Sequence, residues 1–314
     1  MQEPVVIGID AGGTNVRALV CDGSGTRLGT GTATGANPTS RGPEAAAATI
    51  GVALAGALST VDASRVGRAV IGAAGSVAQG TELAVELKKV WAGAGLACSF
   101  ELRSDLEVAF AAGRPDESGV VVLAGTGAAV AEIRSGRMVR CLDGAGWLLG
   151  DVGSGFWLGR EAVRAALAHL DGTGESTVLA AAIAAALGVP EEKWPVVRAV
   201  YAREPLELAA LAPLVGSAAA EGDAVAGRIV VTAVDTLVSE AAILLHDTPD
   251  LTAAVLAGGV LLAGGELAER VGMALTTEHA LAVGLARDGA AGAAWLAMRE
   301  SGAPPVEVHA ALTA

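Results

Sequence analysis

The chain is poor in cysteine and in basic residues, and each shortage excludes a class of protein. Its cysteines are Cys21, Cys98 and Cys141, an odd and scattered set without Cys-x-x-Cys spacing. Such a set predicts reduced thiols in a cytoplasmic protein and excludes a cysteine-built zinc or iron–sulfur site within one chain. Lysine and arginine number 21 against 34 aspartates and glutamates, for a formal net charge of −13. That balance argues against nucleic acid or an anionic membrane as partner.

The chain also lacks a long apolar run, a basic N-terminal segment and any spacing of histidines that is typical of a metal site. The longest apolar stretch, residues 178–189, is too short to span a bilayer. The first four residues carry no basic side chain, so we expect no signal peptide. With 314 residues, 52% of them hydrophobic, the chain is long enough for two domains with cores of their own.

The stretch that organises the sequence is VVIGIDAGGTNVR, residues 5–17. A β-branched apolar run ends in Asp10, the small residues Gly12-Gly13-Thr14 follow, and a second apolar run begins. This pattern predicts a strand, a tight turn and a returning strand. Glycines let backbone N–H groups close on an anion such as phosphate, and Asp10 could hold Mg²⁺ directly or through water. The alternative is a glycine-rich hairpin in which Asp10 is only a turn residue.

The same pattern occurs again in the second half of the chain. Strand signals at 5–10, 16–21 and 27–34 predict an antiparallel meander, and helices alternate with strands up to about residue 114. The polar stretch 115–119 marks a boundary. Beyond it, 120–124 and 128–133 flank the turn Gly125-Thr126-Gly127, which indicates an internal duplication of one strand–turn–strand unit.

The rest of the second half is predicted to be mainly helical. One strand is expected at 253–257, and the tail 301–314, with two prolines, is expected to be frayed. The predicted helices cover 155–170, 176–187, 191–201, 207–220, 223–245, 266–273 and 283–299.

A carboxylate stands where a predicted strand passes into a helix, in Ser104-Asp105-Leu106-Glu107. One interpretation is a capping box, with Ser104 as the N-cap and Glu107 reaching back. The capping box explains Ser104 and Glu107 but does not explain Asp105. In the first turn of a helix the dipole favours its ionised form, which suits a residue that accepts a proton from a substrate hydroxyl.

Two glycine-rich stretches remain. Residues 144–155 hold five glycines around Trp147 and Asp151. Trp147 offers an apolar face and Asp151 a hydrogen-bond acceptor, a combination that suits a sugar. The alternative is a glycine-rich connector around a core tryptophan. Gly258-Gly259 follows a strand and would permit a flat group such as adenine to approach, although a turn that starts a helix explains the pair equally well.

Residues 5–17, 125–127, 144–155 and 257–259 together resemble the actin/Hsp70/hexokinase ATPase superfamily, and within it the N-acetylglucosamine kinase branch of the BadF/BadG/BcrA/BcrD-type ATPases. The resemblance covers nearly the whole chain. It implies an α/β fold of two ribonuclease-H-like, actin-like ATPase domains with a cleft between them. The first domain would be 1–116, with a C-terminal helix at about 283–300 packed back on it, and the second 117–282 with helical insertions.

The resemblance also implies a set of site residues. It places Asp105 as the catalytic base and Asp10 at Mg²⁺, directly or through water. The residues that it assigns to ATP are Gly12, Gly13, Thr14, Asn15, Gly125, Thr126 and Gly127 at the phosphates, with Gly258 and Gly259 near adenosine. Those that it assigns to the sugar are Asn37, Asp105, Thr126, Gly146, Trp147 and Asp151.

The activity that the resemblance implies is phosphorylation of N-acetylglucosamine by ATP to give the 6-phosphate and ADP in a cytoplasmic enzyme. Val152 stands where the family often has glutamate, so glucosamine remains an alternative substrate. An ATPase switch that drives a partner protein is a second alternative. The absence of that class's cysteine motif and the presence of Trp147 and Asp151 both argue against it. The sequence leaves open whether the chain forms a homodimer.

Overall fold

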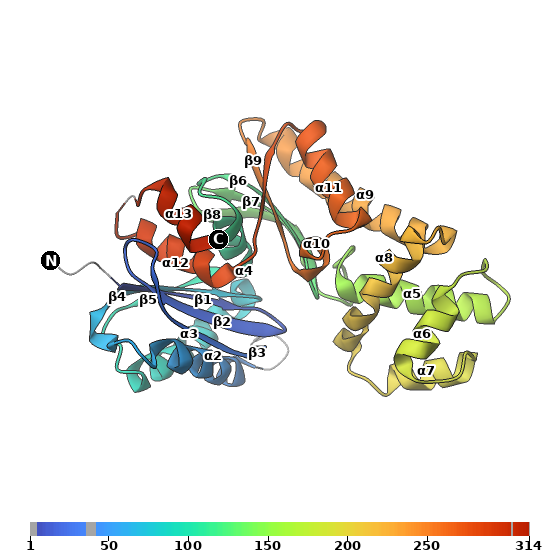
Figure 1. Ribbon diagram of the computed structural model, residues 1–314, viewed down its shortest axis with the longest axis horizontal. Helices are drawn as coiled ribbons and strands as arrows, with labels where there is room; N and C mark the ends of the chain where they lie inside the picture. The colour runs from blue at the N-terminus through green and yellow to red at the C-terminus, as the bar shows by residue number, and fades with distance from the viewer. Residues whose placement is uncertain (1–4, 36–41, 303, 314) are drawn as a thin grey trace. The chain divides into compact units, whose positions relative to one another are not determined.

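The computed structural model describes residues 5–35, 42–302 and 304–313, which form two compact units (Figure 1). Unit 1 comprises the described residues of Met1–Val121, Ile133–Val139 and Gly284–Ala314, and unit 2 those of Val122–Glu132 and Arg140–Val283. The domain limits predicted after residues 116 and 282 remain our proposal.

The first sheet has five strands in the order β3-β2-β1-β4-β5. β1 pairs antiparallel with β2, and β2 with β3, which confirms the predicted meander; β4 is parallel to both β1 and β5. The strands are β1 (Val5–Ala11), β2 (Asn15–Cys21), β3 (Arg27–Thr34), β4 (Val66–Ala73) and β5 (Phe100–Ser104).

Both faces of β1 are buried, which explains why residues 5–9 form an unbroken apolar run. Val5, Ile7 and Ile9 belong to one core with α2 (Pro43–Leu58) and α3 (Ser76–Gly93). Val6 belongs to a second core, on the opposite face, because successive side chains of a strand point to opposite sides. Figure 1 shows α2 and α3 on one side of the sheet and α12 on the other.

The second core is built by α4 (Asp105–Gly113) and by α12 (Gly289–Arg299), which contacts β1, β2, β4 and α4. The helix predicted over 283–299 was therefore too long. Residues Ala282–Leu285 form strand β10, and Asp288 caps α12 by accepting a bond from the Ala291 N–H at 3.3 Å. The apolar residues of this short strand continue the apolar pattern of the helix, so the sequence did not separate the two elements.

The prediction of a frayed tail was wrong for its second half. Residues Val306–Thr313 form helix α13, in which His309 and Leu312 are buried. The His309 Nε2 atom lies 2.8 Å from the Ala111 carbonyl oxygen, and its ring packs edge-on against Trp295 with centroids 5.1 Å apart. A helix of eight residues is held here by tertiary contacts rather than by its own propensity.

The second sheet repeats the first in its connectivity. Its order is β10-β9-β6-β7-β8, which read from the other edge is a three-strand meander followed by two added strands, as in the first sheet. This confirms the duplication that the two glycine turns indicated. The strands are β6 (Gly119–Ala124), β7 (Ala128–Arg134), β8 (Arg137–Asp143), β9 (Ala253–Ala257) and β10 (Ala282–Leu285).

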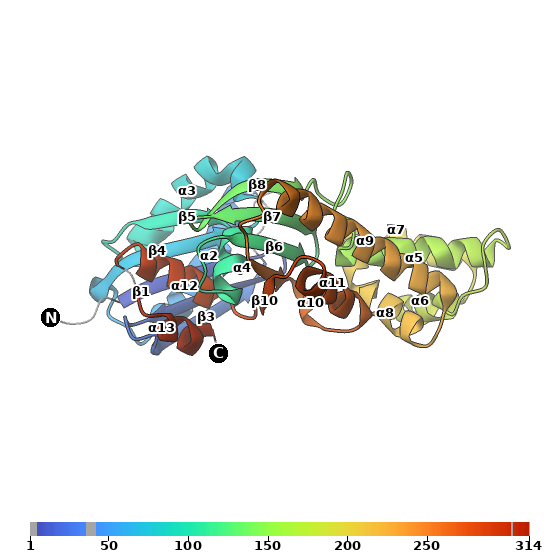
Figure 2. The ribbon, with the colours of Figure 1, turned by 90° about the horizontal axis from the view of Figure 1, so that it is seen from above.

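Unit 2 is otherwise helical, and α5 has the bounds that the sequence predicted (Figure 2). The Ser154 hydroxyl caps α5 by accepting from the Trp157 N–H at 3.1 Å. Helix α9 is long and apolar enough to cross a bilayer by length and composition, but its buried face packs on α5, α8 and α11, as in the core of a folded domain. The helices are α5 (Gly155–Leu170), α6 (Leu179–Leu187), α7 (Lys193–Tyr201), η2 (Pro205–Leu211), α8 (Ala212–Ala220), α9 (Ala224–Asp247), α10 (Gly259–Leu262) and α11 (Glu266–Thr277).

Candidate active site

Asp10 lies near the end of β1, just before the β1–β2 turn. The Gly12 N–H donates to the Asn15 carbonyl at 3.0 Å, which closes the turn, and Gly13, Thr14 and Asn15 are exposed. The Asp10 carboxylate lies against the first residue of α12, because a Cβ on Gly289 would come within 2.3 Å of Asp10 Oδ2. The first turn of a helix has free N–H groups and the positive end of its dipole, so this position favours a carboxylate.

Asp105 is the first residue of α4, directly after β5. The Ser104 hydroxyl caps the helix by accepting from the Leu106 N–H at 3.2 Å, as the sequence predicted. The other half of the expected capping box is absent: Glu107 instead binds Arg103 Nη1 at 3.2 Å and accepts from the Met138 N–H at 2.9 Å. Burial raises the pKa of Asp105, against hydrogen bonds from Ser104 and Leu106 that lower it.

Asp10 and Asp105 interact electrostatically within unit 1. The pKa of Asp10 is raised to about 7, mainly by burial and then by the negative charges of Asp105 and Asp288, while the positive charge of Arg17 acts to lower it. A carboxylate surrounded by like charges is stabilised in its ionised form by a cation. Carboxylate oxygens are the ligands that Mg²⁺ prefers. The described residues form no cluster of three or more His, Cys, Asp or Glu side chains that could hold a metal ion, and Asp288 pairs with Arg27 at 2.7 Å, so Mg²⁺ at Asp10 stays a prediction.

In unit 2, two predicted glycine segments come together. The Gly125 N–H donates to the Gly127 carbonyl at 2.8 Å and so forms the β6–β7 turn. Gly258 has φ +87°, and a Cβ there would lie 2.4 Å from the Ala124 carbonyl, so only glycine permits this approach of β9 to the turn. The residue after it, Gly259, begins α10.

The same turn meets the glycine-rich loop through Asp151. A Cβ on Gly127 would lie 2.9 Å from Asp151 Oδ2, and the Ala128 backbone N–H donates to the same carboxylate. Burial raises the pKa of Asp151, and the charge of Asp143 adds to the effect, whereas the bonds from Ala128 and Gly146 oppose it. Thr126 and Asp151, both assigned to the sugar, are therefore neighbours across Gly127.

Trp147 is 37% exposed and packs edge-on against Phe156, with ring centroids 5.4 Å apart. It is thus a supported aromatic face at the surface rather than a core tryptophan. Gly146, at φ +88°, donates its N–H to Asp151 Oδ1 at 3.3 Å. Trp147, Gly146 and Asp151 lie on one loop, as the sequence predicted.

The structure thus gathers the predicted residues into two groups, one in each unit. Asn37 lies outside the described residues. Sequence reasoning missed Asp143, Gly289 and the Arg103–Glu107 pair. For Asp143 and Gly289 the only local signals are the dipeptides Asp143-Gly144 and Asp288-Gly289, which are common in ordinary turns.

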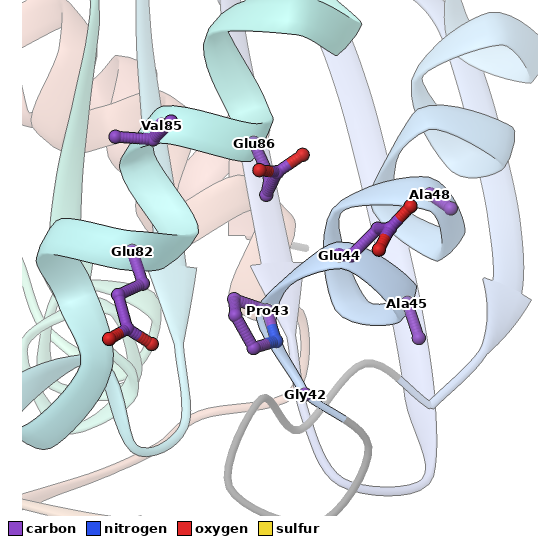
Figure 3. A pocket seen from close by; sticks show the side chains of 8 residues that line it. All are labelled: Gly42, Pro43, Glu44, Ala45, Ala48, Glu82, Val85 and Glu86. Carbon is purple, nitrogen blue, oxygen red and sulfur yellow. The ribbon is translucent and has the colours of Figure 1, made fainter.

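A groove between α2 and α3 in unit 1 is separate from these groups (Figure 3). It carries three carboxylates, which disfavours phosphate; that of Glu86 binds Lys89 Nζ at 2.7 Å. None of the predicted site residues that the structure describes lines this groove. Its lining residues are Gly42, Pro43, Glu44, Ala45, Ala48, Glu82, Val85 and Glu86.

Two sheets of matching connectivity, each with a glycine turn after its first strand, define the actin-like ATPase class of α/β proteins. Residues 7–297 match the model of the BadF/BadG/BcrA/BcrD ATPase family. The chain belongs to this family.

Similar proteins carry sugar kinase names. The chain is 34% identical over 129 residues to an N-acetylmuramic acid/N-acetylglucosamine kinase of Clostridium acetobutylicum, a match that spans 40% of this chain and 42% of that protein. It is 27% identical over 254 residues to an N-acetyl-D-glucosamine kinase of Dictyostelium discoideum, covering 76% of this chain and 78% of that protein. The crystal structure of a proposed N-acetylglucosamine kinase from Chromobacterium violaceum superposes with a TM-score of 0.75 at 26% identity, covering 94% of this chain and 99% of that one.

Proposed function

We propose that this chain is an ATP-dependent amino-sugar kinase that transfers the γ-phosphoryl group of ATP to the 6-hydroxyl of N-acetylglucosamine. The names of its relatives support a sugar kinase of this type. The observation that carries the mechanism is Asp105, a half-buried carboxylate of raised pKa at the N-terminus of α4, electrostatically coupled to Asp10.

Phosphoryl transfer requires positioning and charge stabilisation more than covalent help from the protein. Asp105 orients the acceptor hydroxyl and takes its proton as the new P–O bond forms. Burial makes its carboxylate a better proton acceptor, because a raised pKa brings a general base closer to neutral pH. The Ser104 cap and the start of α4 keep it in place.

Asp10 would hold Mg²⁺, directly or through water, and the ion would supply positive charge that offsets the charge of the phosphates. The turns 12–15 and 125–127 bind the phosphate oxygens through backbone N–H groups other than those of Gly12 and Gly125, which close the turns. Gly258-Gly259 leaves room for adenosine. The exposed first turn and the contact of Gly258 with the second turn support this assignment.

The sugar is held by the loop that carries Gly146, Trp147 and Asp151, with Thr126 beside it and Asn37 as a further contact. An indole face against the apolar side of a pyranose and a carboxylate against its hydroxyls are a common way to bind sugars. The Trp147 ring on Phe156 and the buried Asp151 carboxylate support this role.

A coupled assay of ADP release over N-acetylglucosamine, glucosamine, N-acetylmannosamine and glucose tests the proposal. We expect N-acetylglucosamine to have the highest kcat/KM and its 6-phosphate to form in step with ADP. Asp105→Asn should keep sugar binding and lose about 10²–10⁴-fold in kcat. Asp116→Asn is the matched control, because this carboxylate pairs with Arg114 at 2.7 Å.

ATP turnover that does not depend on any sugar, with no sugar phosphate formed, would contradict the kinase and favour the ATPase switch. A preference for glucosamine would keep the kinase and change its substrate. Undiminished kcat in Asp105→Asn would remove Asp105 from the role of base.

A further inference from the structure

Asp143 joins the two ends of the glycine-rich loop. It is the last residue of β8, and its Oδ1 atom accepts from the Asp151 N–H at 2.8 Å and from the Ala145 N–H at 3.3 Å. Its Oδ2 atom accepts from the Val152 N–H at 3.0 Å. One carboxylate therefore binds backbone both at the start of the loop and eight and nine residues further along the chain.

The loop is shaped to admit this carboxylate. A Cβ on Gly150 would lie 2.0 Å from Asp143 Oδ1, so any other residue there would displace it. Asp143 and Asp151 are both non-glycine residues at positive φ, +55° and +58°. Such conformations persist where the surroundings hold them, and they gather at ligand sites.

A second carboxylate closes the loop in the opposite direction, because Asp151 accepts from the Gly146 N–H at 3.3 Å. Trp147, the aromatic residue of this loop, lies between Ala145 and Asp151, at which Asp143 binds the backbone. Hydrogen bonds from N–H groups to an ionised acceptor are among the stronger ones in proteins, which suits them to fixing a loop rich in glycine.

We propose that Asp143 is a positioning residue, which fixes the loop 144–152 so that Trp147 and Asp151 face the sugar already in their binding arrangement. This inference rests on the proposed function for the identity of the ligand. Asp143 itself need not touch the sugar. Its effect is on sugar affinity, because a bound geometry that is set in advance costs less to adopt.

Amide hydrogen exchange tests, without any ligand, the clamp that the Asp143 carboxylate forms with the N–H groups of Ala145, Asp151 and Val152. In Asp143→Gly, the backbone can keep its positive φ while the acceptor is lost, and we expect the Asp151 and Val152 amides to lose at least about tenfold in protection. Asp143→Asn tolerates the same backbone and keeps one neutral acceptor, so its loss should be smaller. Asp247→Asn is the control, because Asp247 pairs with Arg140 of the same strand β8, at 2.7 Å.

Steady-state kinetics test the consequence. Asp143→Gly and Gly150→Ala should each raise the KM for N-acetylglucosamine about tenfold or more and leave the KM for ATP within about twofold, because small displacements of binding groups are costly. Asp143→Asn should lie between these variants and the wild type. Equal rises in both KM values, or a lowered unfolding temperature with unchanged KM values, would show a merely structural role and overturn the proposal.

The two hypotheses can fail separately. If the wild type phosphorylates no sugar while the Asp151 and Val152 amides still depend on Asp143, the proposed function fails and the clamp stands. Suppose that the wild type phosphorylates N-acetylglucosamine, and that Asp143→Gly has the same sugar KM and the same amide protection as the wild type. The proposed function then stands, and the positioning role of Asp143 is overturned.

Discussion

The two sheets share one connectivity, yet they bring a carboxylate to their glycine turns in different ways. In the first sheet the carboxylate is Asp10, part of the strand that leads into the turn. In the second sheet the corresponding strand ends in Leu123-Ala124, and the carboxylate beside the turn is Asp151, which comes from a later loop.

This difference indicates that the two copies of the duplicated strand–turn–strand segment have different functions. Next to the first turn, Asp10 interacts with the negative charges of Asp105 and Asp288, which the positive charge of Arg17 partly offsets. Around the second turn lie Gly258, with its backbone in close contact, and Asp151, which is part of the loop that carries Trp147. On the proposed assignment, the first copy would serve Mg²⁺ and phosphate, and the second would serve phosphate through its turn and the adenosine and sugar through the elements around that turn.

Asp10→Asn tests the function of the first copy and should have the largest effect. Loss of the charge that holds Mg²⁺ should lower kcat about 10²–10³-fold, as removal of one electrostatic contact to the reacting phosphate does elsewhere. Activity measured over a range of Mg²⁺ concentrations checks it, with Asp22→Asn as control because the Asp22 carboxylate accepts bonds from the local turn residues Ser24 and Thr26. A kcat near that of the wild type at every Mg²⁺ concentration would remove the metal from Asp10.

The first turn could be predicted from the sequence because all its parts are local. Strand β3 and helix α5 have the predicted bounds for the same reason. Where an alternating or apolar run is bounded by glycine or by a serine cap, the sequence itself marks the end of the element. The failures lie where local signals are weak. Strand β10 has four residues, and α13 is held by His309 and Leu312 against distant elements.

The arrangement of the second turn could be predicted only in part. Glycine enrichment and the Trp147–Asp151 pair indicated a ligand loop. The role of Asp143 could not be predicted, because its partners are backbone N–H groups, which have no sequence signature, and because positive φ at Asp143 and Asp151 breaks the local preference of non-glycine residues. The approach of Asp10 to Gly289 is likewise a contact between residues far apart in the chain.

Glu300→Gln tests whether the stability of unit 1 depends on the ionisation of a carboxylate that unit 2 does not contain. Burial opposes ionisation of Glu300, but its bonds with Glu101, Arg103 and Arg68 lower its pKa to about 2. A lowered carboxylate pKa stabilises the fold above the unfolded value of about 4.5, and that contribution is lost as the pH falls through about 2. The variant should therefore lose about 2 kcal/mol in unfolding free energy at pH 7.

Denaturant unfolding of Glu300→Gln from pH 7 to pH 2 measures this difference, which should shrink as the pH falls. Hydrogen exchange should place the loss in unit 1. The matched control is Glu266→Gln in unit 2, because Glu266 forms only an exposed helical pair with Arg270 at 3.3 Å. A constant difference at every pH would show that packing, not charge, is the cause.

Gly127→Ala and Gly13→Ala compare the two turns directly. A Cβ on Gly127 meets Asp151 Oδ2 at 2.9 Å, whereas nothing lies within 4 Å of one on Gly13. Gly127→Ala should raise the sugar KM about tenfold by moving the carboxylate of Asp151, which we propose binds the sugar. Gly13→Ala should leave the sugar KM unchanged and raise the KM for ATP, because its methyl group stands where phosphate must approach backbone. If both variants raise the same KM, the two turns do not divide the substrates.

Glu240→Gln should give the smallest change, with a pH dependence opposite to that of Glu300→Gln. Burial, followed by the negative charge of Asp143, raises the pKa of Glu240 in unit 2 to about 7. A raised carboxylate pKa stabilises the fold below about 4.5 relative to higher pH, and this contribution is lost as the pH rises through about 7. The variant should thus be about 1 kcal/mol more stable than the wild type at pH 8 and equal to it near pH 4. Unfolding at the two pH values measures this. A variant less stable at pH 8 would mean that the ionised Glu240 has a favourable partner, and burial would then not be the dominant influence on this carboxylate.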